Sequence, residues 1–303
     1  MTDFSHAGLD PEIAAFVDRT LAHYPADTAE RNATVQRRAY DSLCRAFDAA
    51  LPEGIGFQDR IVPGEAKGIE VPVRIYHPPR VDRPDTLVLY MHGGGFVVGG
   101  LHSHHGVCAE LTGIAGCALA SVDYRLAPEH VHPAQFEDCR AAFRHFAARY
   151  ERIVVAGDSA GGNLAAAVCV ALREAPARPV GAVLIYPSLG GDQLGLDSYA
   201  RHADAPMLTA ADIVAFNRLW HGGPKKTGDP SSAPLLADSF AGHPSTAIFS
   251  AAIDPLCDDG PEYARRLTAA GIPAACHVED GLVHGYLRAR AMSRLGRAAF
   301  ARI

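Results

Sequence analysis

The chain has 303 residues, of which 48% are hydrophobic and 20% are charged, a composition typical of a soluble globular protein. This length is large for one hydrophobic core but lies within the range of large single α/β domains. A formal net charge of −6 and scattered lysine and arginine residues argue against nucleic acid or an anionic membrane surface as a partner, and no apolar run is long enough to span a bilayer.

The cysteines and the N-terminus bear on the cellular compartment. The seven cysteines contain no C-x-x-C pair, and most lie in apolar stretches such as 166–170. This pattern is typical of buried free thiols in a reducing compartment and not of disulfides or zinc ligands. The first residues lack the basic region and apolar core of a signal peptide. We therefore expect a cytoplasmic protein.

Helices and strands alternate along most of the chain. Residues 11–50 have the apolar spacing of helices, with a break around Pro25. The predicted strands are Val71–Tyr76, Thr86–Met91, Ala118–Val122, Ile153–Ala156, Val180–Tyr186, Thr246–Ala252 and Ala274–Val278. The predicted helices between and after them lie near residues 103–115, 134–150, 160–174, 260–270 and 286–302. This alternation indicates an α/β fold, a mostly parallel sheet with helices on both faces.

Residues 188–235 interrupt the alternation. They contain clusters of Pro, Gly and Asp around one amphipathic helix candidate, Ala210–Trp220. Together with the N-terminal segment 1–55, this insertion is expected to form a helical cap over the catalytic domain, residues 56–303. Six apolar residues in these segments could cover a pocket, although for most of them packing onto the core is the commoner role. They are Phe16, Leu21, Met207, Phe216, Leu219 and Trp220.

Two glycine-containing motifs follow predicted strands. Residues 92–96 read His-Gly-Gly-Gly-Phe, and residues 157–161 read Gly-Asp-Ser-Ala-Gly. The second motif has the G-x-S-x-G pattern that exposes a serine hydroxyl at a sharp strand-to-helix turn, and the first can supply backbone N–H groups for an oxyanion. Either motif alone is weak in a chain with 29 glycines. Together, at the strand ends where such sheets bind ligands, they favour a serine hydrolase.

Ser159, in the second motif, is the candidate nucleophile. A serine hydroxyl becomes nucleophilic when a histidine takes its proton, and that histidine needs an acid to fix its tautomer. In this type of hydrolase the order along the chain is serine, acid, histidine. Asp254, at the end of the strand before the last one, is the predicted acid. Asp258 and Asp259 follow within one turn and are expected to be N-cap or first-turn acids of helix 260–270.

His284 is the predicted base. It lies in the loop after the last predicted strand, at the sheet edge where Ser159 is expected. Histidines that also follow Ser159, but lie in the insertion, at the far end of a strand or within a strand, are His202, His221, His243 and His277.

The other histidines have structural interpretations. His102, His104 and His105 lie close together, but no acid or cysteine completes a metal site around them, and a polar helix N-terminus is expected instead. The ring of His92 is expected to hydrogen-bond backbone groups and so hold the glycine loop. We expect neither a metal nor a cofactor.

These motifs resemble those of the hormone-sensitive-lipase-like (family IV) carboxylesterases of the α/β-hydrolase superfamily. The resemblance covers nearly the whole chain after residue 55. The motifs that carry it, in family order, are His92–Phe96, Asp123–Glu129, Gly157–Asn163, Asp254–Gly260 and His284–Tyr286. Two small departures are Cys257, where the family often has Arg, and Tyr286, where Phe is commoner; neither touches the chemistry.

The resemblance implies an α/β-hydrolase fold with a helical cap. It also implies a catalytic triad formed by Ser159, Asp254 and His284. The backbone N–H groups of Gly94, Gly95 and Ala160 would form the oxyanion hole. The charges of the Asp123–Glu129 motif are expected to pair locally in a structural network under the active-site loops. The family is compatible with a monomer or a homodimer.

The sequence therefore predicts a carboxylic-ester hydrolase that acts through an acyl-enzyme on small-molecule esters with short to medium acyl chains. A lactonase or amidase would use the same residues. A non-catalytic ligand-binding protein could share the fold, although it would have no physical reason to retain the triad and the glycine loop.

Overall fold

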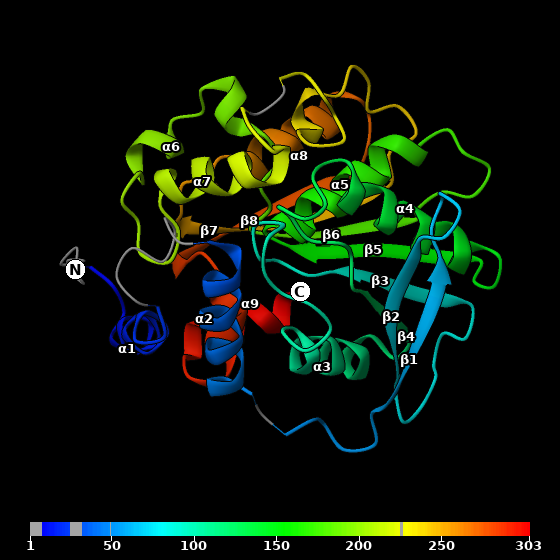
Figure 1. The fold of residues 1–303 in the computed structure, drawn as a ribbon, viewed down its shortest axis with the longest axis horizontal. Coiled ribbons are helices and arrows are strands. Elements are labelled where there is room, and N and C mark those ends of the chain that lie inside the picture. The colour runs from blue at the N-terminus through cyan, green and yellow to red at the C-terminus, as the bar shows by residue number, and fades with distance from the viewer. Residues whose placement is uncertain (1–7, 25–31, 49, 225–226) are drawn as a thin grey trace.

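An eight-stranded sheet runs through the centre of the computed structural model, which describes residues 8–24, 32–48, 50–224 and 227–303 (Figure 1). The strands lie side by side in the order β1-β2-β4-β3-β5-β6-β7-β8. Their bounds are β1 Gly56–Pro63, β2 Glu70–His77, β3 Thr86–Met91, β4 Ala118–Val122, β5 Arg152–Asp158, β6 Gly181–Ile185, β7 Ser245–Ile253 and β8 Ala274–Val283.

Most of the sheet is parallel. β2 pairs antiparallel with β1 and β4, and the other neighbouring strands pair in parallel. The predicted α/β class is confirmed, and each predicted strand is present. β1 was not predicted, because Val62 is the single buried residue among its eight. A strand exposed at the sheet edge has no apolar run by which a sequence can reveal it.

Helices cover both faces of the sheet (Figure 1). α3 (His105–Ala115) and α9 (Arg294–Arg302) pack on one face. α4 (Ala134–Ala147), α5 (Ala160–Leu172) and α8 (Asp259–Ala269) cover the other. Because both faces are covered, the central strands are continuous apolar runs.

The hydrophobic core is correspondingly divided between the two faces. One cluster of buried side chains includes Leu89, Phe143 and Leu164, and the other includes Phe16 and Phe300. α5 lies almost entirely inside the first cluster. Its alanine- and glycine-rich sequence lets it approach the sheet closely, which places its N-terminus beside the strand ends.

The predicted helix over 286–302 is two elements. A 3-10 helix, η4 (Tyr286–Ala291), comes first, and α9 begins after Ser293. The hydroxyl of Ser293 accepts a hydrogen bond from the backbone N–H of Gly296 at 3.3 Å. A serine in this position starts a new helix, because its oxygen satisfies an N–H that has no partner within the helix.

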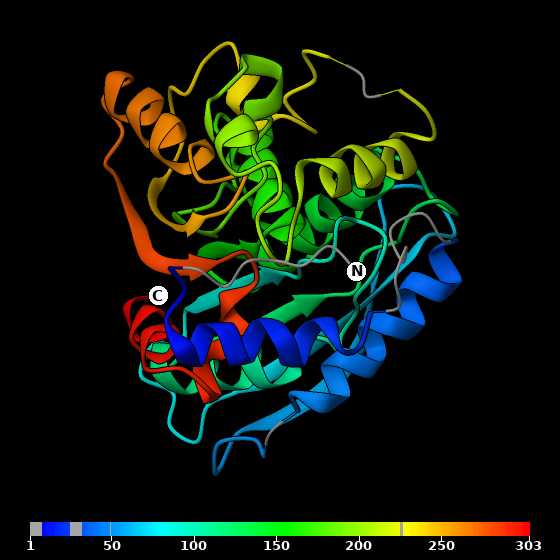
Figure 2. The same ribbon diagram turned by 90° about the vertical axis from the view of Figure 1, so that its left-hand side faces the viewer.

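Four further helices flank the carboxyl ends of the parallel strands. α1 (Pro11–Leu21) and α2 (Ala33–Ala46) come from the N-terminal segment, and α6 (Ser198–Arg201) and α7 (Ala210–His221) come from the insertion. Figure 2 faces this edge of the sheet: α1 and α2, in blue, lie on its lower side, and α7, in yellow-green, lies on its upper side.

Several sequence expectations concern thiols, membranes and the N-terminus. All seven cysteines are free thiols; six are buried and Cys276 is half-buried, as their apolar surroundings predicted. Within the described ranges, no helix is long and apolar enough to cross a membrane. The predicted break around Pro25 and residues 1–7, where a signal peptide would begin, lie outside the described residues.

Candidate active site

The turn between β5 and α5 presents Ser159 at the carboxyl edge of the sheet. Ser159 has φ 55° and ψ −118°, a conformation that is costly for a residue with a side chain. A Cβ atom on Gly161 would overlap the backbone oxygen of Met91 on β3. The glycine therefore lets α5 start directly against the sheet, and the strained turn leaves the Ser159 hydroxyl half-exposed.

A chain of hydrogen bonds joins three predicted site residues. The Ser159 hydroxyl donates to Nε2 of His284 at 2.9 Å, and Nδ1 of His284 donates to a carboxylate oxygen of Asp254 at 2.7 Å. Asp254 is completely buried, and its other oxygen accepts from the backbone N–H of Leu256 at 2.9 Å. Because an ionised carboxylate can only accept, it assigns the proton of a neutral imidazole to Nδ1 and leaves Nε2 free to take the serine proton.

The ends of neighbouring strands bring these residues together. Asp254 directly follows β7, and His284 directly follows β8. The prediction ended the last strand at Val278 and placed His284 in a loop. Instead β8 continues to Val283 after a register shift against β7 between Ala251 and Ile253, so the strand itself delivers the histidine.

The glycine loop after β3 forms a tight turn. Gly94 has φ 128°, and its carbonyl accepts from the backbone N–H groups of Val97 and Val98, both at 3.0 Å. A Cβ atom on Gly94 would overlap the carbonyl of Val98, so the turn requires glycine. Within the described part of the chain, the N–H groups of Gly94, Gly95 and Ala160 donate to no other residue.

His92 holds the start of this loop. Its Nδ1 lies 2.8 Å from the carbonyl oxygen of Gly93, and its own carbonyl accepts from the hydroxyl of Tyr124 at 2.7 Å. The ring is fully buried and stacks on Tyr124 with centroids 4.2 Å apart. Burial lowers the pKa of His92 to about 3, so the ring is neutral at neutral pH. Its role is structural, since it hydrogen-bonds to the backbone of the loop. This agrees with the role expected from the sequence.

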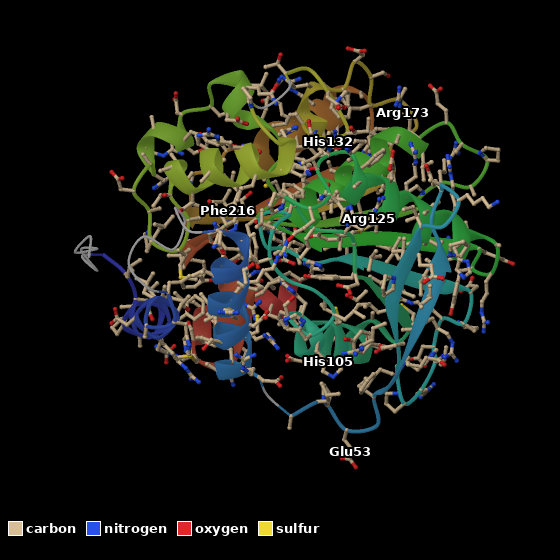
Figure 3. The ribbon with its side chains drawn as sticks, in the orientation of Figure 1. Glu53, His105, Arg125, His132, Arg173 and Phe216 are labelled. Atoms are coloured by element: carbon tan, nitrogen blue, oxygen red, sulfur yellow. The ribbon has the colours of Figure 1, made fainter. Side chains whose placement is uncertain are left out.

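Two charged residues of the Asp123–Glu129 motif pair with residues on helices α4 and α2. Arg125, labelled in Figure 3, donates from both Nε and Nη2 to the Asp138 carboxylate on α4, at 2.8–3.0 Å. Glu129 accepts from Arg37 on α2 at 2.6 and 2.8 Å. The motif is therefore part of a structural network, as expected. Its charges do not pair locally, however, because their partners come from two separate helices.

The acids after Asp254 occupy their predicted positions at the start of α8, Asp258 at the N-cap and Asp259 in the first turn, but their side chains bind elsewhere. Asp258 stands before α8, but its side chain caps no N–H of that helix and instead pairs with Arg201 at 2.8 Å. Asp259 accepts from the backbone N–H groups of Leu189 at 2.6 Å and Gly191 at 3.3 Å, and burial raises its pKa to about 7. Both acids connect the loop after Asp254 to the insertion, whose donors lie 57 to 70 residues away in the chain.

The histidines near α3 contact different partners. His102 pairs with Asp41 at 2.8 Å, and His105 shares a hydrogen bond of 2.8 Å with the hydroxyl of Tyr76. His104 occupies the position before α3, as predicted. Among the residues that the structure describes, no three side chains are arranged to hold a metal ion.

Two side chains of the insertion lie close to the loops that contain Gly95 and Gly285. A Cβ atom on Gly95 would overlap the ring of Phe216 on α7, so this ring lies against the glycine loop (Figure 3). The methyl group of Met207 lies 3.7 Å from the point where a Cβ of Gly285 would stand, next to His284 in the chain. Of the other predicted roof residues, Phe16 and Trp220 are buried in the core, and Leu21 and Leu219 pack against its edges.

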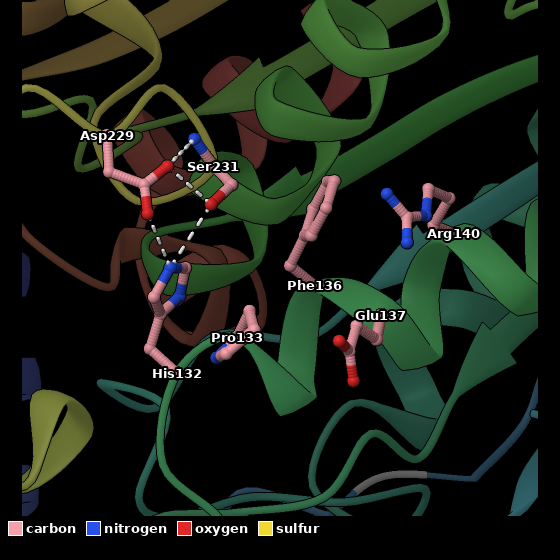
Figure 4. A pocket seen from close by; sticks show the side chains of 7 residues that line it. All are labelled: His132, Pro133, Phe136, Glu137, Arg140, Asp229 and Ser231. Atoms are coloured by element: carbon pink, nitrogen blue, oxygen red, sulfur yellow. Dashed lines mark hydrogen bonds and ion pairs between the residues drawn. The ribbon is translucent and has the colours of Figure 1, made fainter. Parts of the chain in front are cut away.

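A second Ser-His-Asp cluster lies in a cavity of about 340 Å³ (Figure 4). Nε2 of His132 is 3.1 Å from both the Ser231 hydroxyl and the Asp229 carboxylate, and that hydroxyl donates to Asp229 at 2.7 Å. A relay needs the serine and the acid on different ring nitrogens. Here the serine and the acid both contact Nε2, so the cluster does not activate Ser231 as a nucleophile. It connects the start of α4 to the insertion.

Comparisons with known proteins identify relatives of this chain. A sequence model of the α/β hydrolase fold matches residues 88–288. Esterase LipI of Mycobacterium tuberculosis is 44% identical over 71% of this chain and 70% of its own. Carboxylesterase NlhH of the same organism is 36% identical over 91% and 89%. The crystal structure of an esterase from the bacterial hormone-sensitive lipase family superposes with a TM-score of 0.85 at 30% identity, covering 97% of this chain and 96% of that one.

Proposed function

Because the chain belongs to the hormone-sensitive-lipase-like (family IV) carboxylesterases of the α/β-hydrolase superfamily and is a carboxylic-ester hydrolase, we propose that it cleaves esters through an acyl-enzyme on Ser159. The hydrogen-bonded chain from Asp254 through His284 to Ser159 is the observation that carries this proposal. In this mechanism Ser159 is the nucleophile, His284 the general base and Asp254 the acid that orients it.

Each half-reaction uses the same groups. The Ser159 oxygen attacks the ester carbonyl carbon as its proton passes to Nε2 of His284. The resulting oxyanion accepts hydrogen bonds from backbone N–H groups in the glycine loop and at the start of α5, which we assign to Gly94, Gly95 and Ala160. His284 then protonates the departing alcohol. A water molecule, deprotonated by His284, then attacks the acyl-enzyme; as the bond to Ser159 breaks and the acid leaves, His284 returns this proton to the Ser159 oxygen.

A fluorophosphonate probe tests the acyl-enzyme proposal directly. Such a probe forms a stable phosphonyl ester with an activated serine, so we expect one adduct per chain, located on Ser159 by peptide mass spectrometry. The Ser159→Ala variant is the control and should stay unlabelled. An adduct on another residue, or active protein that takes up no probe, would contradict the assignment.

We also propose that residues 1–55 and 188–235 act as a cap over this site. Two contacts support the cap: Arg37 on α2 pairs with Glu129 beneath the glycine loop, and the ring of Phe216 on α7 lies against Gly95. We further propose a cytoplasmic enzyme that is a monomer or a homodimer and uses no cofactor. A roof over the cleft limits the length of the acyl chain, whereas a lipase needs an exposed apolar docking surface.

This cap predicts a preference for short to medium acyl chains. Across p-nitrophenyl esters from acetate to palmitate, we expect activity to be highest for short to medium chains and to fall towards palmitate. In the Phe216→Ala variant the ratio of octanoate to butyrate turnover should rise about fivefold, because the ring no longer limits the cleft. Val214→Ala is the matched control, since Val214 lies on the same helix and is 69% exposed. A maximum at palmitate, or activation at an oil–water interface, would instead indicate a true lipase.

A further inference from the structure

One buried carboxylate, that of Asp158, lies between the nucleophile turn and the glycine loop. We propose that Asp158 is a positioning residue that sets the oxyanion N–H groups relative to Ser159. It is the last residue of β5 and is bonded directly to Ser159, and its side chain is only 6% exposed. This inference rests on the proposed roles of Ser159 and the glycine loop.

Four hydrogen-bond donors converge on this carboxylate. Its Oδ1 accepts from the backbone N–H of Gly93 at 2.9 Å and from the hydroxyl of Tyr90 at 2.8 Å. Its Oδ2 lies 3.2 Å from Nε2 of His104 and accepts from the hydroxyl of Tyr186 at 3.4 Å. An ionised carboxylate offers about four lone-pair sites, so the four donors match its full capacity.

The surroundings keep Asp158 ionised. Burial raises the pKa of this carboxyl group, but the neighbouring His104 and the hydroxyl of Tyr90 outweigh burial and hold the pKa below its usual range. Hydrogen bonds to an ionised acceptor are stronger than those between neutral groups. The bond to Gly93 is therefore a firm tether.

The carboxylate is connected to both ends of the segment from Gly93 to Gly100, directly at the first end and through His104 and Ser103 at the second. At the start, it holds the N–H of Gly93, whose peptide precedes the two glycines assigned to the oxyanion hole. At the end, Nδ1 of His104 is 2.9 Å from the Ser103 hydroxyl, which donates to the carbonyl of Gly100 at 2.8 Å. The loop is thus held at two points by the side chain of Asp158, the residue that directly precedes Ser159 in the chain.

A third connection leads to the catalytic base. Tyr186, which donates to Asp158, packs its ring against that of His284 with centroids 4.8 Å apart. Tyr186 has φ 32°, a strained conformation that its surroundings must maintain. Nucleophile, oxyanion loop and base therefore share one anchor. Positions held in this way matter for catalysis because the oxyanion donors must meet the transition state at hydrogen-bond distance.

The Asp158→Ala variant tests the tether. We expect kcat per active site, counted with the fluorophosphonate probe, to fall about 10²–10³-fold, the effect of losing an oxyanion donor. KM should stay within about threefold, because the ground-state carbonyl gains little from the hole. The affinity for a trifluoromethyl ketone, whose adduct carries the oxyanion, should fall in parallel with kcat. The matched control is Glu279→Ala, which removes another buried carboxylate, paired with Arg302 on α9.

The Asp158→Asn variant separates positioning from simple stability. Its carboxamide oxygen can still accept from Gly93 while its amide donates to a neutral His104, so kcat per active site should stay within about tenfold of wild type. If Asp158→Ala does not fold, Asp158→Ser replaces it, since a serine hydroxyl is too short to reach Gly93. Retention of kcat within about tenfold in Asp158→Ala, or equal losses in the alanine and asparagine variants, would overturn the inference. Absence of probe on Ser159 in wild type would instead overturn the proposed function.

Discussion

Replacing Ser159 by alanine is expected to lower kcat about 10⁵–10⁶-fold while the protein stays folded. The half-exposed hydroxyl donates to His284 and contributes little to the core, so its loss removes the nucleophile and little packing. Turnover of p-nitrophenyl butyrate measures the loss, and thermal unfolding followed by circular dichroism checks the fold. A variant that keeps more than about 1% of wild-type turnover would show that another group is the nucleophile.

The base should have an effect of the same size. We expect His284→Ala to lose about as much kcat as Ser159→Ala, and the double variant to lose no more than either single one. Groups that act as one unit give such non-additive losses, because removing either member disables the other. Additive losses would mean that His284 contributes to catalysis independently of Ser159.

The second large effect is expected at Asp254. Substitution to asparagine should lower kcat about 10⁴-fold, because an amide can donate to the imidazole and so favours the tautomer that cannot accept the serine proton. KM should change little, since the buried side chain lies behind the histidine, away from the substrate. Stopped assays at high enzyme concentration extend the measurable range far enough to detect this loss.

Asp258→Asn is the matched control for this substitution. Asp258 lies in the same loop, but its carboxylate pairs with Arg201 on α6 and accepts from the backbone of Ser198. We expect kcat to stay within about threefold of wild type. If Asp258→Asn loses more activity than Asp254→Asn, the acid has been assigned to the wrong residue.

The α/β class was readable from the sequence because its central strands are buried on both faces. Runs such as Thr86–Met91 and Ala118–Val122 are mostly apolar and matched the strand bounds. β1 escaped prediction for the converse reason, since an edge strand buries almost nothing. The 286–302 segment was predicted as one helix because its apolar spacing is helical on both sides of Ser293. Ser293 caps a new helix there, and a serine is a weaker sign of a helix boundary than a proline or glycine.

The candidate site combines local and long-range information. The turn around Ser159 and the glycine loop are encoded within a few residues each, because steric crowding at a strand-to-helix turn depends on immediate neighbours. The order of elements then limited the candidates to Asp254 and His284, and the structure brings His284 within hydrogen-bond distance of both Asp254 and Ser159. Chain order suffices here because parallel strands deliver their carboxyl ends to one edge.

The sequence alone therefore determined the fold class, the motif turns and the choice of site residues, all of which depend on local pattern or strand order. Tertiary structure alone decided which charges pair and what holds the loops. The partners of Glu129 and Asp259 lie 92 and 70 residues away, and the Asp158 carboxylate gathers its four donors from three separate segments. Such contacts arise from packing between distant elements, and no spacing within the chain encodes them.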